Sequence, residues 1–421
     1  MNDQYRRTLT YILLGIALVS SAAYDTVFMQ VYERVQQGLA GLMALCFGGI
    51  IFIQRYSLKQ LGRAFADAWP LHVYSVVFLV ICFAFHGGYR LPQVLAYTYF
   101  AYATYFMLPF IFREDQTVFQ AFIRQIAWLS ALLAIPSFFG AAGFDRLGGI
   151  RLRNKPSYAE FSGIIASGGF FEHPEGHALQ MGFGILCAIY LLQRSGTFAN
   201  LAILILTTLG LIVSQGRAAI YGLCIAAAFH VLPSIFRRSR LVFIGTFALL
   251  LLFPYVIWPQ MSQLPGISSY LRMERGLSGR GEAWEFAADV IREKPATGHG
   301  FMASATITWE AQRYLRRTGF SGAGTTFHNT FISKAVDFGL VATGLYMLLY
   351  IVPLWRICPE DEYRLERELI RGIIVLTITT AIYRDYNIGG VRSTVVIGAI
   401  FLGLASIWHS VVHRAATSQN A

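Results

Sequence analysis

The sequence predicts an all-α polytopic membrane protein with about twelve transmembrane helices and one large loop that contains short helices. Three observations predict this class. Of the 421 residues, 55% are hydrophobic and only 14% are charged, and the mean hydropathy is +0.51. Apolar segments long enough to cross a hydrocarbon core of roughly 30 Å recur along the whole chain. Soluble domains of ordinary composition carry about 25% charged residues, so a soluble fold is excluded.

Hydrophobic runs divide the chain into twelve predicted spans. These lie at about 8–23, 38–54, 70–86, 91–112, 122–140, 177–193, 199–214, 218–235, 241–258, 331–355, 369–383 and 393–410. The first run follows Met-Asn-Asp-Gln-Tyr-Arg-Arg without a small-residue cleavage site, so we expect a retained helix and not a signal peptide. No second soluble domain stands out, and residues 1–421 are expected to form a single membrane domain.

The distribution of basic residues predicts the orientation. If the N-terminus is cytoplasmic, sixteen arginines and lysines lie in inner segments and only five lie in short outer loops. This difference satisfies the positive-inside rule. Both termini are then cytoplasmic, and two long loops, 141–176 and 259–330, face outward, which in a bacterium is the periplasm. The net charge of +11 does not indicate a nucleic-acid partner, because no basic patch is interleaved with surface aromatics.

Two arginines lie in glycine-containing outer turns. Arg217 belongs to Ser-Gln-Gly-Arg-Ala, with apolar runs on both sides, and Arg280 belongs to Ser-Gly-Arg-Gly. An arginine this close to hydrocarbon needs a partner or an anionic ligand, or it reaches the headgroups with its long side chain. After Arg280, the residues Ala283, Ala287, Val290 and Ile291 share one face of a predicted helix. Ser278 could cap that helix, which would place Arg280 in its anion-attracting first turn.

A histidine and an asparagine, His328 and Asn329, stand where the chain re-enters the membrane. Histidine titrates near neutrality and can take a proton from a hydroxyl group. A structural role at the start of the helix is an equally good interpretation.

Histidines and carboxylates also gather in the loop Gly168 to Gln180. His173 and His177 are four residues apart, with Glu172 and Glu175 beside them. A zinc site is conceivable, but Pro174 and Gly176 oppose a continuous helix and the pattern is not His-Glu-x-x-His. We therefore predict no metal and keep His173 as a substrate-binding candidate.

The last outer turn carries Arg384, Asp385 and Arg392. An ion pair within the turn is one interpretation. The other is that Arg384 lines the same outer cavity and binds substrate.

These motifs together resemble the O-antigen ligase and polymerase superfamily of bacterial inner-membrane glycosyltransferases. The resemblance is carried by Ser-Gln-Gly-Arg217-Ala, by Ser-Gly-Arg280 with Trp284, and by the run Glu-Lys-Pro-x-x-Gly-x-Gly. It also includes His328-Asn329, followed after nine residues by Gly339. It implies that Arg217 and Arg280 bind the donor and take part in catalysis, that His328 is the catalytic base and that Asn329 binds substrate.

The resemblance implies a donor oligosaccharide on undecaprenyl diphosphate and an acceptor that is either a glycan or the lipid A core. It implies no cofactor. The motifs are compatible with a polymerase of O-antigen or exopolysaccharide, which we favour, and with an O-antigen ligase. A transporter of lipid-linked sugars is the alternative from another class, but it would place charges near the bilayer midplane and show repeat symmetry.

Overall fold

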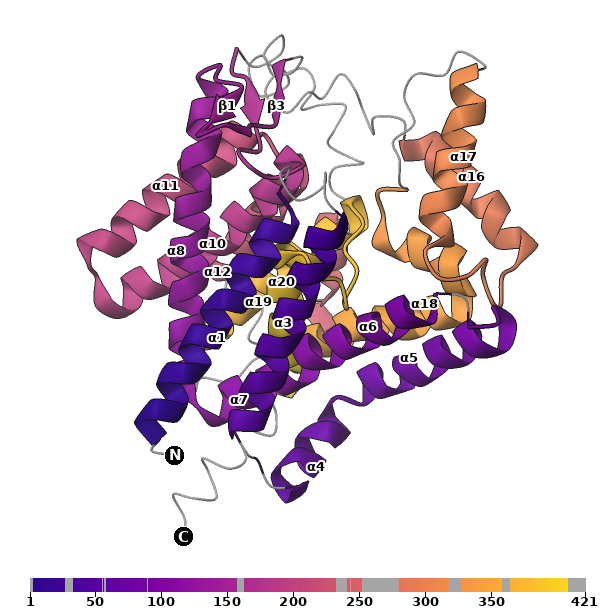
Figure 1. The fold of residues 1–421 in the computed structure, drawn as a ribbon, viewed down its shortest axis with the longest axis horizontal. Coiled ribbons are helices and arrows are strands. Elements are labelled where there is room, and N and C mark those ends of the chain that lie inside the picture. Colours follow the sequence, from indigo (N-terminus) through magenta and orange to yellow (C-terminus); the bar gives the residue numbers. More distant parts are fainter. Residues whose placement is uncertain are drawn as a thin grey trace.

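The structure is a computed structural model that describes residues 3–26, 33–54, 56, 58–88, 90–156, 163–231, 241–242, 244–251, 280–317, 327–357 and 364–407. Helices dominate it (Figure 1). The α-helices are α1 (Asp3–Tyr24), α3 (Glu33–Gln54), α4 (Leu58–Asp67), α5 (Trp69–Val80), α6 (Leu91–Tyr102), α7 (Leu108–Glu114), α8 (Gln116–Ala141), α10 (Pro174–Ser195), α11 (Phe198–Ser214), α12 (Arg217–Val231), α16 (Arg280–Glu293), α17 (Ala303–Arg317), α18 (Thr330–Arg356), α19 (Arg364–Tyr383) and α20 (Ser393–Ser406). The π-helical turn η1 (Ile81–Phe85) extends α5. The π-helical turn η2 (Ala103–Met107) joins α6 to α7.

Six helical segments of the described chain are long and apolar enough to cross a membrane. They are Asp3–Tyr24, Arg34–Gln54, Leu91–Glu114, Gln116–Ala141, Pro174–Ser195 and Thr330–Arg356. Shorter apolar helices cover Trp69–Phe85, Phe198–Ser214, Arg217–Phe229 and Ser393–Ser406. The predicted all-α membrane class is therefore confirmed. The count of twelve remains a prediction, and the eighth, ninth and twelfth predicted spans, 218–235, 241–258 and 393–410, lie only partly within the described residues.

The centre of the bundle is formed by α10, α19 and α20. Helix α10 packs against α8, α11, α12, α19 and α20. Every residue of α20 is buried. A helix that is apolar on all sides suits a buried position in a protein core or a membrane, and in this chain the neighbouring helices cover α20.

The loop 141–176 contains short strands that the sequence did not predict. Strand β1 (Arg146–Leu147) pairs with β2 (Ile150–Arg151), and β3 (Asn154–Lys155) pairs with β4 (Ala166–Ser167), both antiparallel. In Figure 1, β1 and β3 lie above α8. An isolated bridge between Thr26 and Phe171 ties the end of α1 to the end of this loop.

The loop 259–330 contains the short helices that we predicted, α16 and α17, which stand together above α18 (Figure 1). The predicted apolar face of α16 is confirmed. Ala287 and Val290 are buried in one cluster with Phe327 and Val336, and Ala283 and Ile291 pack against it. This face fixes α16 on the start of α18. Ser278, the predicted cap, lies outside the described residues.

A break in α18 receives the loop that follows α16. Gly339 has φ 78° and ψ 176°, which interrupts the helical hydrogen bonds. The loop supplies replacements: His299 N donates to Val336 O at 2.9 Å, and Gly300 N donates to Asp337 O at 2.9 Å. Leu340 N in turn donates to Pro295 O at 2.7 Å. The Glu-Lys-Pro-x-x-Gly-x-Gly run therefore docks on the break and satisfies its backbone groups.

Candidate functional site

The N-terminal end of α10 is the point at which distant parts of the chain meet. Gly168 and Gly169 lead the chain into it, and Gly169 has a φ of 58° that favours glycine. Glu172 N donates to Asp25 O at 3.0 Å, so the end of α1 is fastened beside α10. A 22-residue helix that begins at Pro174 directs its first N–H groups to this place, where they favour negative charge.

His173 is the N-cap residue of α10. Lys155 Nζ lies 3.0 Å from His173 Nε2. Burial, opposed by the charge of Glu175 and reinforced by those of Arg384, Lys155 and His328, lowers the pKa of His173 to about 3. The ring is therefore neutral at physiological pH. It can bind a substrate by hydrogen bonding but does not attract one by charge.

Arg384 lies beside the first turn of α10, next to Gly176. A Cβ built on Gly176 would lie 3.5 Å from Arg384 Nη1 and 3.6 Å from Asp25 Oδ2. The backbone of Arg384 is held by Thr330, whose hydroxyl donates to Arg384 O at 2.8 Å and accepts from Tyr386 N at 2.5 Å. The last outer turn is thereby joined to the start of α18, with the guanidinium beside α10.

His328 lies in the turn before α18 with φ +51°, an uncommon backbone conformation for a residue other than glycine. The turn is fixed on both sides. Trp284 Nε1 of α16 donates to Phe327 O at 2.8 Å, and Asn329 Oδ1 accepts from Phe331 N at 2.9 Å and from Ile332 N at 3.0 Å. Asn329 thus caps α18 through its carbonyl oxygen. The imidazole of His328 is half-buried and close enough to His173 to affect its pKa.

Arg217 is the first residue of α12, and the turn before it packs on α10. Gln215 has φ +52° and ends α11. A Cβ on Gly216 would overlap the side chain of Ala178 and lie 3.6 Å from Glu175 Cα. This close approach places the backbone of Arg217 next to the first turns of α10, and its side chain is half-buried.

Arg280 begins α16, as the motif predicted, but its side chain is outside the described part of the structure. Since α16 is attached to Phe327 through Trp284, Arg280 belongs to the element that holds the His328 turn. The structure thus brings His328, Arg384, His173 and the Arg217 turn together around the end of α10.

Arg392, Asp25 and Glu172 form an ion network beside the N-terminal end of α10. Arg392 Nε lies 3.6 Å from Asp25 Oδ1, and Arg392 Nη2 lies 3.8 Å from Glu172 Oε2. Burial raises the pKa of Asp25, and the positive charges of Arg392 and Arg384 partly offset this effect. Asp25 was not a candidate from the sequence, because its partner is more than three hundred residues away along the chain.

The two histidines of the conceivable zinc site have different partners. His177 is fully buried, and its Nε2 lies 3.2 Å from Leu133 O on α8. His173 faces Lys155. Among the described residues, no three histidines, cysteines or carboxylates are grouped so that they could hold a metal ion.

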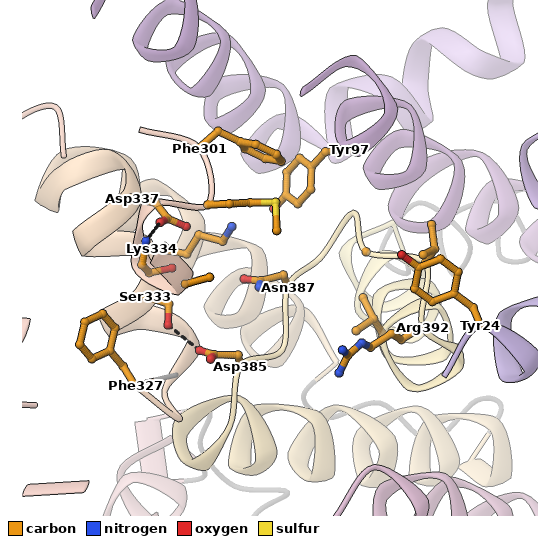
Figure 2. Close-up of a pocket in the computed structure, with 16 residues that line it drawn as sticks. Tyr24, Tyr97, Phe301, Phe327, Ser333, Lys334, Asp337, Asp385, Asn387 and Arg392 are labelled. Atoms are coloured by element: carbon orange, nitrogen blue, oxygen red, sulfur yellow. Dashed lines mark hydrogen bonds between the residues drawn. The ribbon is translucent and has the colours of Figure 1, made fainter. Parts of the chain in front are cut away.

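A cavity of about 410 Å³ has Phe327, the residue before His328, in its lining (Figure 2). Its lining includes Tyr24, Tyr97, Phe301, Met302, Ser304, Ala305, Phe327, Ser333, Lys334, Asp337, Asp385, Asn387, Gly390, Val391, Arg392 and Val395. The figure shows the aromatic rings at its edges and the polar groups between them. Asp385 accepts from Ser333 Oγ at 2.5 Å, so its carboxylate faces α18 while Arg384 faces α10.

Lys334 and Asp337 are functional candidates that the sequence analysis missed. Both are buried, at 3% and 5% exposure, on α18. A usable signal was present, because both are charged residues inside an otherwise apolar predicted span, 331–355. Ionisable residues within membrane helices are costly and usually serve a function.

Comparison with known proteins adds one match. Residues 202–347 match the model of a protein family described as O-antigen ligase. The matched stretch begins in α11 and ends in α18, and so contains Arg217, Arg280, His328 and the break at Gly339. No curated protein matches the sequence.

Proposed function

We propose, because residues 202–347 match the model of the O-antigen ligase family, that this chain is a membrane glycosyltransferase of the bacterial inner membrane. It would transfer an oligosaccharide from undecaprenyl diphosphate to an acceptor hydroxyl at the periplasmic face. The preferred form of this reaction is polymerisation, in which the growing chain is moved onto the next lipid-linked repeat of O-antigen or exopolysaccharide.

The observation that carries the proposal is the meeting of four chain segments at the end of α10. The guanidinium of Arg384, the Arg217 turn and the ammonium of Lys155 surround a helix N-terminus, with His328 beside them. A diphosphate at the membrane surface carries the charge that such an arrangement attracts. Arginine also offers paired N–H donors that match phosphate oxygens.

The chemistry proposed for these groups is a single displacement. The acceptor hydroxyl oxygen forms a bond to the anomeric carbon as the bond from that carbon to the diphosphate oxygen breaks. His328 takes the hydroxyl proton, and the electron pair leaves with the lipid diphosphate. Arg217, Arg280 and Arg384 stabilise the charge that develops on the leaving group. One displacement inverts the configuration at the anomeric carbon, and the arginines supply the positive charge without requiring a metal ion.

A second candidate is ligation, which the printed description of the family favours. A ligase would move the finished glycan onto the lipid A core. The two reactions share the donor and the proposed site, and differ in the acceptor.

The experiment that tests the proposal is a gel of surface polysaccharide from a strain that lacks the gene, with the lipid A core probed separately. Core capped by a single repeat identifies a polymerase of O-antigen. Bare core with long polymer retained on the lipid carrier identifies a ligase, and loss of unlinked polysaccharide with normal core identifies an exopolysaccharide polymerase. Unchanged polysaccharide of every kind would contradict the proposed function.

A further inference from the structure

The cavity beside α18 adjoins the end of α10, because Arg392 lines the cavity and pairs with Asp25 and Glu172. Two polar groups of its lining lack hydrogen-bond partners among the described residues. Within the described residues, the Lys334 ammonium makes no hydrogen bond or ion pair. It lies 5.0 Å from the ring centre of Tyr97, 5.1 Å from that of Phe338 and 5.5 Å from that of Tyr346. Asn387 Oδ1 is buried and without a hydrogen-bond partner. A buried polar atom left unpaired is costly, so both groups are suited to a bound ligand.

The character of the lining indicates what that ligand is. Lys334 offers donors, Asn387 offers an acceptor, and the carboxylates of Asp337 and Asp385 accept hydrogen bonds. Tyr97 and Phe301 add aromatic surface at one edge (Figure 2). Donors and acceptors mixed with flat aromatic groups match the alternating hydroxyls and apolar faces of a sugar ring. The volume of about 410 Å³ also lies within the roughly 300–1,000 Å³ of small-molecule sites.

The balance of charges distinguishes this cavity from the donor site. In the cavity, Asp337 and Asp385 balance the positive charges of Lys334 and Arg392. At the end of α10, Arg384, Lys155 and the helix dipole attract a diphosphate, and the carboxylates of Asp25 and Glu172 lie beside Arg392. Asp337 is held in place, because its Oδ1 accepts from Ser304 N at 2.7 Å in the first turn of α17. A neutral saccharide is therefore a better fit to the cavity than the phosphate end of the donor.

The turn before α18 and the last outer turn each contribute one residue to the cavity and the next or preceding residue to the end of α10. In the turn before α18, Phe327 lines the cavity and His328 acts on His173 at the end of α10. In the last outer turn, Asp385 lines the cavity and Arg384 lies against Gly176. The turn that carries His328 thus lies between the cavity, which Phe327 lines, and the end of α10. A base that takes a proton from the acceptor must lie between acceptor and donor.

We propose that this cavity binds the terminal sugar of the acceptor glycan and presents its hydroxyl to His328. The proposal rests on the proposed transfer reaction and adds the acceptor site to it. Lys334 and Asn387 are its specificity-determining residues, because their unpaired groups reject a ligand that lacks matching hydroxyls.

The test uses the full-length protein in nanodiscs and two probes. One is the repeat oligosaccharide released by mild acid from the lipid-linked pool of the same bacterium, and the other is the core oligosaccharide from its lipopolysaccharide. Saturation-transfer NMR measures binding of each probe. Lys334→Met and Asn387→Leu should each weaken binding of one probe by about 10-fold or more, as expected for a lost buried hydrogen bond to a charged or polar group. Lys294→Met, an exposed substitution with the same change of charge, should not.

Three further outcomes are informative. Loss of probe binding in both cavity variants, with donor affinity and melting temperature kept, supports the acceptor site. Unchanged binding in both variants, in a protein that still transfers sugar, overturns the inference and leaves the proposed function intact. Binding that depends on Lys334 in a protein without transferase activity overturns the proposed function instead, and shows a saccharide site of another purpose.

Discussion

Gly339 of α18 lies against the backbone of Ala296, so closely that a Cβ on Gly339 would fall 2.5 Å from the carbonyl carbon and oxygen of Ala296. Gly298 is in the same situation, because its Cβ would overlap the Asp337 peptide. Two glycines thus allow two backbones to meet directly. This contact holds Asp337 and the start of α17 in place and explains why the motif needs glycine at both positions.

We expect Gly339→Ala to destabilise the protein by about 1–3 kcal/mol, because the added methyl overpacks a backbone contact. The φ of 78° and ψ of 176° add to this cost, since this region is open essentially only to glycine. The measurement is the melting temperature of the purified protein in detergent. Gly344→Ala is the control on the same helix, because no atom lies within 4 Å of its added Cβ. Equal melting temperatures for the two variants would refute the role of the contact.

His328→Asn should lower the rate of sugar transfer by about 10²- to 10⁴-fold, the usual contribution of a general base. Asparagine is chosen because it tolerates the positive φ of this position, so the turn keeps its conformation. The rate of the native protein should fall on acidification, since a protonated imidazole cannot accept a proton, and this dependence should be absent from the variant.

The control for this prediction is donor binding, which the His328 variant should retain. Transfer at the native rate would assign the proton to a different group. Loss of donor binding together with loss of transfer would indicate that the substitution disturbed the site as a whole.

Arg217→Ala, Arg280→Ala and Arg384→Ala should each weaken binding of the undecaprenyl diphosphate donor by about 10- to 100-fold, as expected for hydrogen bonds to a charged group. Arg384→Lys should recover only part of the affinity, because lysine offers a point charge without the paired donors of arginine. The matched control is Arg151→Ala, which removes the same charge from an exposed position of β2. If the donor affinity falls equally in all four alanine variants, the loss of affinity reflects net charge and not a specific contact.

Much of the fold follows from hydrophobic patterning. The apolar runs predicted the positions of α1, α3, α8, α10 and α18, and the spacing of Ala283, Ala287, Val290 and Ile291 predicted the buried face of α16. These features are local, since each depends on the sequence of one segment. The strands β1 to β4 escaped prediction because two-residue strands leave no periodic signal.

The sequence predicts the motif residues of the candidate site but not the contacts between its distant segments. Motifs indicated Arg217, Arg280 and His328, and the family match over 202–347 includes all three. The meeting of Arg384 with Gly176 and of Arg392 with Asp25 depends on how distant helices pack, which no local pattern encodes. Lys334 and Asp337 could have been identified from the sequence as charged residues within a predicted span. Their cavity could not, because it forms only where α18 lies beside α6 and the last outer turn.

Asp25 predicts how stability depends on pH. Its carboxyl is 7% exposed, and burial raises its pKa above the ordinary value of 3.8 although Arg392 and Arg384 oppose the effect. The folded state therefore holds this proton more tightly than the unfolded state. The contribution of Asp25 to stability is full at pH values below the unfolded pKa, and it is lost as the pH rises through the folded pKa.

Acidification from neutral pH through the folded pKa of Asp25 should thus make the folded state more stable relative to Asp25→Asn, whose side chain does not titrate. Arg392→Met should enlarge this difference, because it removes the nearest positive charge and leaves the carboxylate buried without its ion pair. The measurement is the melting temperature in detergent as a function of pH for the three proteins. If Asp25→Asn melts at the native temperature at every pH, the pKa of Asp25 is the same in the folded and unfolded states. If the pH effect is smaller in Arg392→Met than in the native protein, Arg392 does not stabilise the carboxylate.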